Sequence, residues 1–496
     1  MVKVLFVYHN ELEEGFMPAS LAVLGGVARE AGAESRLFDT SFWRDKDSEL
    51  IENNRQVRER TGEFKRVEGY NPEREIVDIK KRFMQVVEDY RPDLIAATST
   101  SYEFNSLLDF MLPAKKRFNI PTIVGGSHPT VDPERSIQKT GVDMLCIGEG
   151  EKALFELLKR MEHGKDPSDI PNLWVKRENG EIIRNNLGAQ IQMDDIPEPN
   201  WDIFDERHRI RPFEGELKSY GFFEISRGCP HSCSYCINDK MHKLYKEANI
   251  DSKVFRFHSP EEIVRRISKF KDKYNFNHIQ FIDENLSVMP IKDLEKLATL
   301  YQQQVGVGFF AMARPEPIAA NPKKADLLKQ MGCSMVALGA ESGNYWLRNT
   351  ILNRPMKEGV LEAAAKELQS RGIMVSIYNI IGFPEETRSM IFDTIKLNRR
   401  IQPERFSVRF LNPYPGTQIR DYCVEKRYLE QNYEDLRATK SFLIEPVLKL
   451  PSPPHPTKQE LMDLKQNFGR YIRMSNEEFN EVMKQESAGI KPQPYL

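Results

Sequence analysis

The chain has 496 residues, of which 40% are hydrophobic and 29% charged, and this length is enough for about three globular domains. The 71 basic and 73 acidic side chains nearly cancel, so nucleic acid is not an expected partner. No apolar run approaches the roughly 18 residues that a membrane-spanning helix requires, and the apolar start at 2–8 is too short for the core of a signal peptide.

Residues 1–165 alternate short apolar runs with helical patterns. This alternation predicts a doubly wound, Rossmann-like α/β domain with a mostly parallel sheet. The expected strands are 2–8, 34–38, 93–97, 121–125 and 144–148, and the expected helices are 18–31, 74–89 and 104–118.

In such a sheet, ligands bind beyond the carboxyl ends of the strands. The loops at this edge carry hydroxyl groups for polar contacts and paired glycines that allow close backbone approach to a bulky ligand. The candidate binding residues are Thr98, Ser99, Thr100, Ser101, Gly125, Gly126, His128, Gly148 and Glu149. Taken singly, each of these motifs also fits an ordinary tight turn, and for His128 a structural role in its turn is favoured over ligation.

Two stretches lack this regular alternation. Residues 40–73 are charged and without a period, so we predict a surface insertion that is suited to act as a lid. Residues 166–215 contain repeated prolines and predict a linker between domains, with a strand pair near 173–175 and 181–184.

The most specific motif follows the apolar run at 222–225, which predicts a strand. Cys229, Cys233 and Cys236 are spaced Cys-x3-Cys-x2-Cys, and three such thiolates can hold three irons of a [4Fe-4S] cube while the fourth iron stays open. A zinc knuckle closed by a nearby histidine, or a redox disulfide, is the alternative. The other three cysteines are isolated, so no disulfide framework is expected, and a reducing cytoplasm is the predicted location.

Within residues 216–425, strand and helix patterns repeat about six times. The expected strands are 222–226, 278–283, 308–313, 335–339, 375–382 and 405–412. Functional side chains of parallel barrels lie at the carboxyl ends of the strands. Those ends contain Asp283, Arg314, Glu341, Ser342, Ile380 and Gly382.

The cysteine motif, with Tyr235 directly before its last cysteine, resembles the signature of radical S-adenosylmethionine (SAM) enzymes. The resemblance implies a partial (β/α)6 barrel, SAM bound to the open iron, and reductive cleavage of SAM to a 5′-deoxyadenosyl radical. It also implies that Tyr235 and the six strand-end residues contact SAM. For Asp283 a solvated loop is the alternative, and for Arg314 a structural ion pair.

The motifs at 125–130 and 148–151 resemble those of the cobalamin-binding domain that precedes the radical domain in one subfamily. The resemblance implies cobalamin as a third cofactor, beside the cluster and SAM. One departure from other cobalamin proteins is the absence of an Asp-x-His-x-x-Gly motif, so cobalt is expected to have no histidine ligand from the protein.

The commonest chemistry of this subfamily is methylation of an unactivated carbon in a small-molecule substrate, and this is the predicted function. Oxidative cyclisation, rearrangement or hydroxylation with the same cofactors is the alternative, as in the anaerobic cyclase of chlorophyll synthesis. A non-enzymatic iron–sulfur or zinc module is a third interpretation. An external reductant such as flavodoxin or ferredoxin is an expected partner, and residues 426–496 are expected to form a helical cap.

Overall fold

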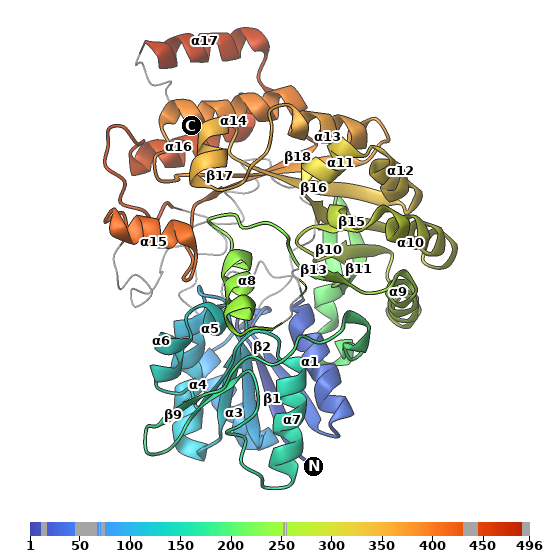
Figure 1. The fold of residues 1–496 in the computed structure, drawn as a ribbon, viewed down its shortest axis with the longest axis vertical. Coiled ribbons are helices and arrows are strands. Elements are labelled where there is room, and N and C mark those ends of the chain that lie inside the picture. The colour runs from blue at the N-terminus through green and yellow to red at the C-terminus, as the bar shows by residue number, and fades with distance from the viewer. Residues whose placement is uncertain are drawn as a thin grey trace.

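The computed structural model describes residues 1–10, 17–44, 67–68, 70, 75–250, 253, 255–429 and 445–488. Two α/β bodies lie end to end, with the N-terminal body at the bottom of Figure 1 and the second body above it. Most of the predicted surface insertion at 40–73 lies outside the described residues. None of the helices in the described ranges has the length and apolar character needed to cross a membrane.

The N-terminal body contains a seven-stranded sheet in the order β2-β1-β5-β6-β7-β8-β9. Strands β2 to β7 are parallel, which confirms the predicted doubly wound arrangement. The strands are β1 (Lys3–Tyr8), β2 (Glu34–Asp39), β5 (Leu94–Thr98), β6 (Thr122–Gly125), β7 (Met144–Cys146), β8 (Leu173–Lys176) and β9 (Ile182–Arg184). The helices are α1 (Ala19–Glu30), α3 (Ile79–Tyr90), α4 (Phe104–Phe118), α5 (Ser127–Val131), α6 (Pro133–Gln138) and α7 (Glu151–Glu162). Two short strands, β3 (Trp43–Arg44) and β4 (Glu75–Ile76), pair with each other in a separate two-stranded sheet.

Both faces of this sheet are covered, because successive side chains of a strand point to opposite sides. Along β1, Leu5 and Val7 are buried in a cluster with residues of α3 and α4, whereas Val4 and Phe6 are buried in a cluster with residues of α1 and α7. The near-continuous apolar sequence of β1 follows from this burial on two sides.

The strands β8 and β9 lie inside the segment predicted as a linker. The predicted strand pair is confirmed, and its two strands also extend the first sheet, since β8 pairs antiparallel with β7. The domain boundaries themselves stay a prediction.

The second body is an open half-barrel with the strand order β10-β11-β14-β15-β16-β17-β18. All neighbours are parallel except β10 and β11. The strands are β10 (Ile210–Phe213), β11 (Glu216–Phe223), β14 (His278–Phe281), β15 (Gly308–Ala313), β16 (Cys333–Glu341), β17 (Met374–Ile381) and β18 (Arg405–Phe410). The helices that follow the strands are α9 (Pro260–Tyr274), α10 (Ile291–Gln304), α11 (Pro315–Ala320), α12 (Lys323–Gln330), α13 (Val360–Gln369) and α14 (Arg388–Ile401).

The predicted strand at 222–226 is interrupted. Strand β11 ends at Phe223, and β12 (Ser226–Gly228) pairs instead with β13 (Phe255–Phe257) in a separate two-stranded ribbon. The break occurs because the Asp283 carboxylate accepts hydrogen bonds from the backbone N–H groups of Ile225 and Ser226. The cysteine loop and α8 (Asn238–Glu247) follow β12, and α8 lies between the two bodies in Figure 1.

Helix α15 (Gln418–Glu425) follows the last barrel strand. The described part of the region predicted as a helical cap contains two helices, α16 (Lys458–Arg473) and α17 (Asn476–Ser487). Helix α16 packs on the outer face of the barrel, where Leu464 and Phe468 share an apolar cluster with Phe392 and Phe406. The segment before α16 reaches the carboxyl end of β17, since Nε2 of His455 accepts a 3.0 Å hydrogen bond from the Glu385 backbone N–H.

Arg399 holds the end of α16 to α14. Its guanidinium donates to the carbonyls of Tyr471 (2.6 Å) and Met474 (2.9 Å). The guanidinium carbon, Cζ, lies 4.3 Å from the ring centroid of Phe479 in α17. We expect Arg399→Ala to lower stability by about 1–3 kcal/mol, because helix-end carbonyls lose a charged donor. Limited proteolysis between α16 and α17 and thermal unfolding measure this effect.

The neighbouring Arg400 provides the control for this measurement. It forms an exposed ion pair with Glu362 at 2.9 Å, and such a pair contributes little to stability. Arg400→Ala should therefore change stability by less than about 0.5 kcal/mol. Equal effects of the two substitutions would contradict the assigned role of Arg399.

Candidate functional site

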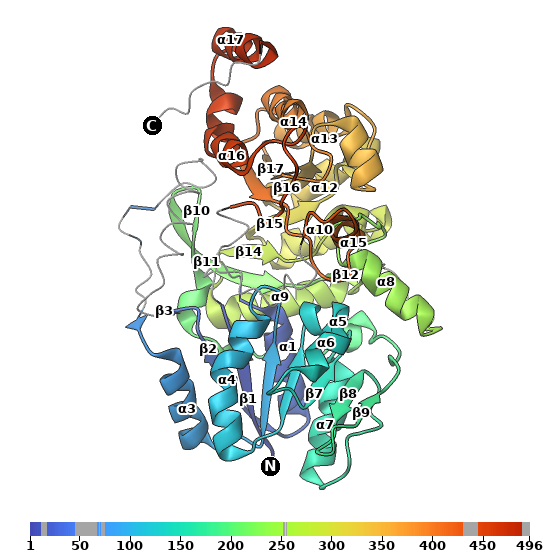
Figure 2. The same ribbon diagram turned by 90° about the vertical axis from the view of Figure 1, so that its left-hand side faces the viewer.

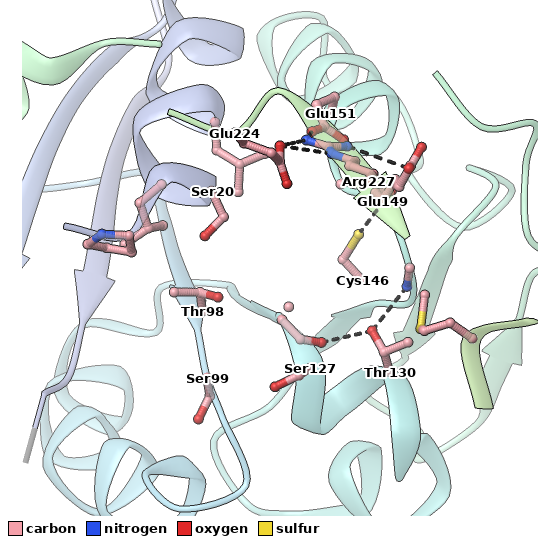
Figure 3. A pocket seen from close by; sticks show the side chains of 18 of the residues that line it. Ser20, Thr98, Ser99, Ser127, Thr130, Cys146, Glu149, Glu151, Glu224 and Arg227 are labelled. Carbon is pink, nitrogen blue, oxygen red and sulfur yellow. Dashed lines mark hydrogen bonds and ion pairs between the residues drawn. The ribbon is translucent and has the colours of Figure 1, made fainter. Parts of the chain in front are cut away.

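A cavity of about 570 Å3 lies between the two bodies. Its lower wall is formed by the carboxyl ends of β1, β5 and β6 and by the loop after β7, where strand order and crossovers leave a crevice. Its opposite wall is formed by Glu224, the ribbon residue Arg227, the start of α8 and Glu284. Figure 3 shows the hydroxyl groups of Thr98, Ser99 and Ser127 on one side and charged side chains on the other.

The loops of the lower wall are fixed to one another. Gly126 has φ +99°, and a Cβ there would lie 2.7 Å from Oγ1 of Thr98. The Thr130 hydroxyl donates to the Gly126 carbonyl at 2.8 Å and accepts from the Gly148 N–H at 3.1 Å. The three loops therefore form one preorganised edge with backbone exposed to the cavity, which is the cradle that a bulky, amide-rich ligand such as cobalamin requires.

The structure brings most of the predicted residues of this edge to the cavity. They are Thr98, Ser99, Thr100, Gly125, Gly126, Gly148 and Glu149. Ser101 and His128 are not among its lining residues, because His128 turns its Nδ1 to the Ser101 hydroxyl at 3.0 Å and packs its ring against Phe104 at 4.4 Å. Burial lowers the pKa of His128 to about 4, so this side chain is neutral and has a role within its turn.

A buried ion-pair network joins the two walls of the cavity. Nη2 of Arg227 lies 2.6 Å from Glu151 and 2.9 Å from Glu224, and Nη1 lies 3.5 Å from Glu149. Arg256 also contacts Glu149. Burial alone would raise the pKa of Glu151, but the charge and hydrogen bond of Arg227 lower it below its usual value. The sequence interpretation predicted Glu149 as a cobalamin contact and missed this network. Arg227 lies two residues before the first cysteine, but Arg256 belongs to neither the glycine motif nor the cysteine motif.

The three cysteines lie on the loop that leaves β12. Cys233 is buried, and its Sγ is 3.6 Å from Nη1 of Arg314 and 3.9 Å from Nη1 of Arg354. Burial raises the pKa of Cys236 to about 11. Three thiols on one loop, with two guanidinium groups beside one of them, suit an anionic cluster that three thiolates hold.

Three of the residues expected at SAM come together above the cysteine loop. Tyr235 hydrogen-bonds to the Glu341 carboxylate, and Tyr235 and Ile380 pack against the same apolar cluster. Burial raises the pKa of Glu341, although Arg354 and Tyr235 oppose this shift. Glu341 itself has φ +59°, a strained conformation for a side chain of this kind and a common property of functional positions.

The other expected residues are already engaged by protein groups. Asp283 accepts from the Ser226 hydroxyl at 2.5 Å, and burial raises its pKa to about 8. The fully buried Ser342 accepts from the Asn344 N–H at 3.2 Å, and Arg314 forms an ion pair with Glu316. The SAM contacts of these residues stay predictions, and for Arg314 the structural ion pair that was the alternative is present.

Gly382 begins a loop that a buried carboxylate stabilises. Oε2 of Glu386 accepts from the N–H groups of Gly382 (2.6 Å) and Phe383 (3.2 Å). The sequence interpretation did not single out Glu386, although it lies four residues after Gly382. The loop keeps Gly382 at the carboxyl end of β17, where the resemblance places SAM.

Comparisons with known proteins support the interpretation of these features. The family model of the radical SAM superfamily matches residues 223–397, and that of the B12 binding domain matches residues 65–158. The first region contains the cysteine loop, and the second contains the loops after β5, β6 and β7 in the lower wall of the cavity. The chain is a radical SAM enzyme with a B12-binding domain.

Two relatives and one solved structure illustrate the family. The chain is 26% identical to an uncharacterized methyltransferase of Pyrococcus horikoshii, over 74% of this chain and 76% of the relative. It is 21% identical to the anaerobic magnesium-protoporphyrin IX monomethyl ester cyclase of Rubrivivax gelatinosus, over 84% of this chain and 69% of the relative. The structure of the cobalamin-dependent SAM radical enzyme OxsB, with aqua-cobalamin and SAM bound, matches with a TM-score of 0.66 and 13% identity. The match covers 98% of this chain and 71% of OxsB.

These findings confirm the predicted fold, the predicted enzyme class and the predicted cofactors of this radical SAM enzyme, which are a [4Fe-4S] cluster, SAM and cobalamin. They replace the interpretation as a non-enzymatic zinc or iron–sulfur module.

We expect Gly126→Ala to lower cobalamin affinity at least about tenfold, because the new methyl group would strain a left-handed residue and displace the Thr98 loop. Equilibrium binding followed by the visible spectrum measures this affinity. The control is Gly164→Ala, since Gly164 has φ +62° with no atom near the added Cβ. Loss of affinity in both variants would indicate a general effect of left-handed strain.

Glu386 predicts a specific pH dependence of stability. Burial raises the pKa of Glu386 to about 8, so the folded state binds its proton more tightly than the unfolded state. Its contribution to stability is complete below about pH 4.5 and is lost as pH rises through about 8. Glu386→Gln should flatten the decline in melting temperature between these pH values, whereas Glu386→Ala should destabilise at every pH by about 1–3 kcal/mol by leaving two buried N–H groups unpaired.

Proposed function

We propose that this enzyme methylates an unactivated carbon of a small-molecule substrate. The observation that carries the proposal is that one cavity is lined both by the B12-binding edge and by Gly228, Ile237 and Asn238, which flank the cysteine loop, so a substrate there would lie beside both cofactor sites. The relative from Pyrococcus horikoshii, named as a methyltransferase, supports it. When bound, the cluster and SAM would supply a 5′-deoxyadenosyl radical, and methylcobalamin would supply the methyl group.

The side chains of this protein would bind and orient those groups. Cys229, Cys233 and Cys236 would hold three irons, and the guanidinium groups of Arg314 and Arg354 would stabilise negative charge beside Cys233.

On the SAM side, Tyr235 and Glu341 would bind the ribose, and Ile380 and Gly382 would border the adenine. Asp283 would position the cysteine loop, because it holds the backbone where the chain leaves β11.

In the B12-binding body, the hydroxyl groups of Thr98, Ser99 and Ser127 would hydrogen-bond to the polar periphery of cobalamin. The exposed backbone at Gly126 and Gly148 would let the macrocycle approach the sheet edge. Cobalamin bound between the two walls would displace water from the cavity, which protects a radical from side reactions. An external reductant such as flavodoxin or ferredoxin would deliver electrons to the cluster.

A second candidate function keeps the same cofactors without methyl transfer. The cyclase of Rubrivivax gelatinosus matches more of this chain than the methyltransferase relative does, at lower identity. Oxidative cyclisation, rearrangement or hydroxylation is therefore the alternative outcome of the same initiating radical.

Product analysis separates the two functions. The reconstituted enzyme is incubated anaerobically with reductant, hydroxocobalamin, methyl-labelled SAM and a small-molecule extract, so that every methyl group comes from SAM. Methylation predicts equal amounts of 5′-deoxyadenosine and S-adenosylhomocysteine, because one SAM makes the radical and another restores the methyl group, and it predicts label in a product. Deoxyadenosine without S-adenosylhomocysteine or labelled product would support the alternative.

We expect Cys233→Ala to abolish cluster assembly and deoxyadenosine formation while cobalamin affinity is retained, because the thiol and the B12-binding edge belong to different bodies. Iron and cobalt counts on one sample, with about four irons and one cobalt in the wild type, measure this directly. Cys333→Ala is the matched control, since Cys333 is a buried thiol of β16 outside the motif. Deoxyadenosine formation by the Cys233 variant would overturn the cluster assignment.

A further inference from the structure

The cysteine loop is attached to a ribbon that carries two facing arginines. In the antiparallel pair of β12 and β13, Arg227 lies directly opposite Arg256, and Gly228 lies opposite Phe255. Cys229 follows Gly228 immediately. Like charges directly opposite one another destabilise a pair of strands. The ribbon at the base of the cysteine loop therefore needs negative charge from elsewhere.

That charge comes mainly from the B12-binding body. Glu151, whose side chain is 7% exposed, contacts Arg227 at 2.6 Å, and Glu149 contacts both arginines. The side chain of Arg256 is also only 7% exposed, and that of Arg227 is 16% exposed. These contacts join residues 76 and 107 positions apart in the sequence, and they cross from one body to the other.

The two glutamates are themselves fixed in place. Glu151 is the first residue of α7, and Oε2 of Glu149 accepts a 3.0 Å hydrogen bond from the Ile191 N–H. The loop that carries them approaches α8 closely, because a Cβ at Gly148 would lie 2.9 Å from the Tyr245 hydroxyl oxygen. The same loop lines the cavity. Its carboxylates thus connect the B12-binding edge rigidly to the base of the cysteine loop, as Figure 3 shows for Arg227.

We propose that Glu149, Glu151, Arg227 and Arg256 form an interdomain clamp that sets the distance and orientation between the [4Fe-4S] cluster and cobalamin. Its members are positioning residues, which act through the cysteine loop and the glycine loop. The charges of the four groups cancel, and the nearby Glu224 adds one further contact to Arg227. Removal of one member leaves a buried charge without its partner, and this favours separation of the ribbon from the B12-binding body. The proposal rests on the cofactors and is independent of whether the reaction is a methylation.

The test is a distance measurement on the protein loaded with both cofactors. The reduced cluster and cob(II)alamin are both paramagnetic. The cluster therefore increases the spin-relaxation rate of cobalt, and this enhancement falls steeply as the distance between the two cofactors grows. We expect Glu151→Gln and Arg227→Lys to retain both cofactors but to weaken this relaxation enhancement about twofold, because loss of the forked, charged contacts lets the two cofactors move apart. Lysine keeps the charge but cannot make the forked contacts of arginine.

The matched control is Glu134→Gln, which alters an exposed ion pair with Arg184 at 2.8 Å in the same body. Its relaxation enhancement should equal that of the wild type. Wild-type enhancement in both clamp variants, with both cofactors bound, would overturn the proposal.

A second measurement needs no substitution and covers the case in which a clamp variant loses a cofactor. Hydrogen–deuterium exchange on the wild-type protein, with the cluster in place, compares the cobalamin-free and cobalamin-bound forms. The clamp predicts that cobalamin slows exchange at least several-fold at 226–228 and 255–257, as well as at 148–151. Slower exchange at 148–151 alone would show that the two bodies are not coupled through these residues and would refute the clamp.

Discussion

The ion pair between Arg227 and Glu151 is the contact on which the arrangement of the functional groups depends. It joins the residue two positions before the first cysteine to the first residue of α7, on opposite walls of the cavity. Buried ion pairs are expensive to form, and they are retained where they specify one arrangement among several. Here the specified arrangement is the way in which the loop edges of the two sheets face one another across the cavity.

Both bodies use the same property of parallel sheets. Loops at the carboxyl ends of the strands are free to vary while the strands keep them in register, and each sheet presents this edge to the other. Cobalamin and the SAM-bound cluster are large groups that must approach one substrate carbon. Two facing edges provide binding surface for both, which a single sheet of this size would not.

The sequence was sufficient for most strands of the two sheets, for the cysteine and glycine motifs and for the family, because these are encoded by local periodicity and spacing. Contacts between distant residues were not predictable. Asp283 breaks the strand at 222–226 from 57 residues away, and Glu149 meets Arg256 across 107 residues. His128 has the sequence neighbours of a ligand, yet its orientation depends on packing against Phe104. Arg314 and Ser342, in contrast, have partners only two residues away, Glu316 and Asn344.

The segment 166–215 has a consequence for how the molecule can move. It begins by adding β8 and β9 to one sheet and ends by adding β10 to the other, and Trp201 and Phe204 within it belong to an apolar core that runs through both bodies. Side chains of both bodies hold its backbone, including Arg29 at Glu198 and Arg266 at Ile196. A connection of this kind does not act as a hinge. Cofactors and substrate are therefore expected to enter by displacement of loops around the cavity, and not by opening of the two bodies about this segment.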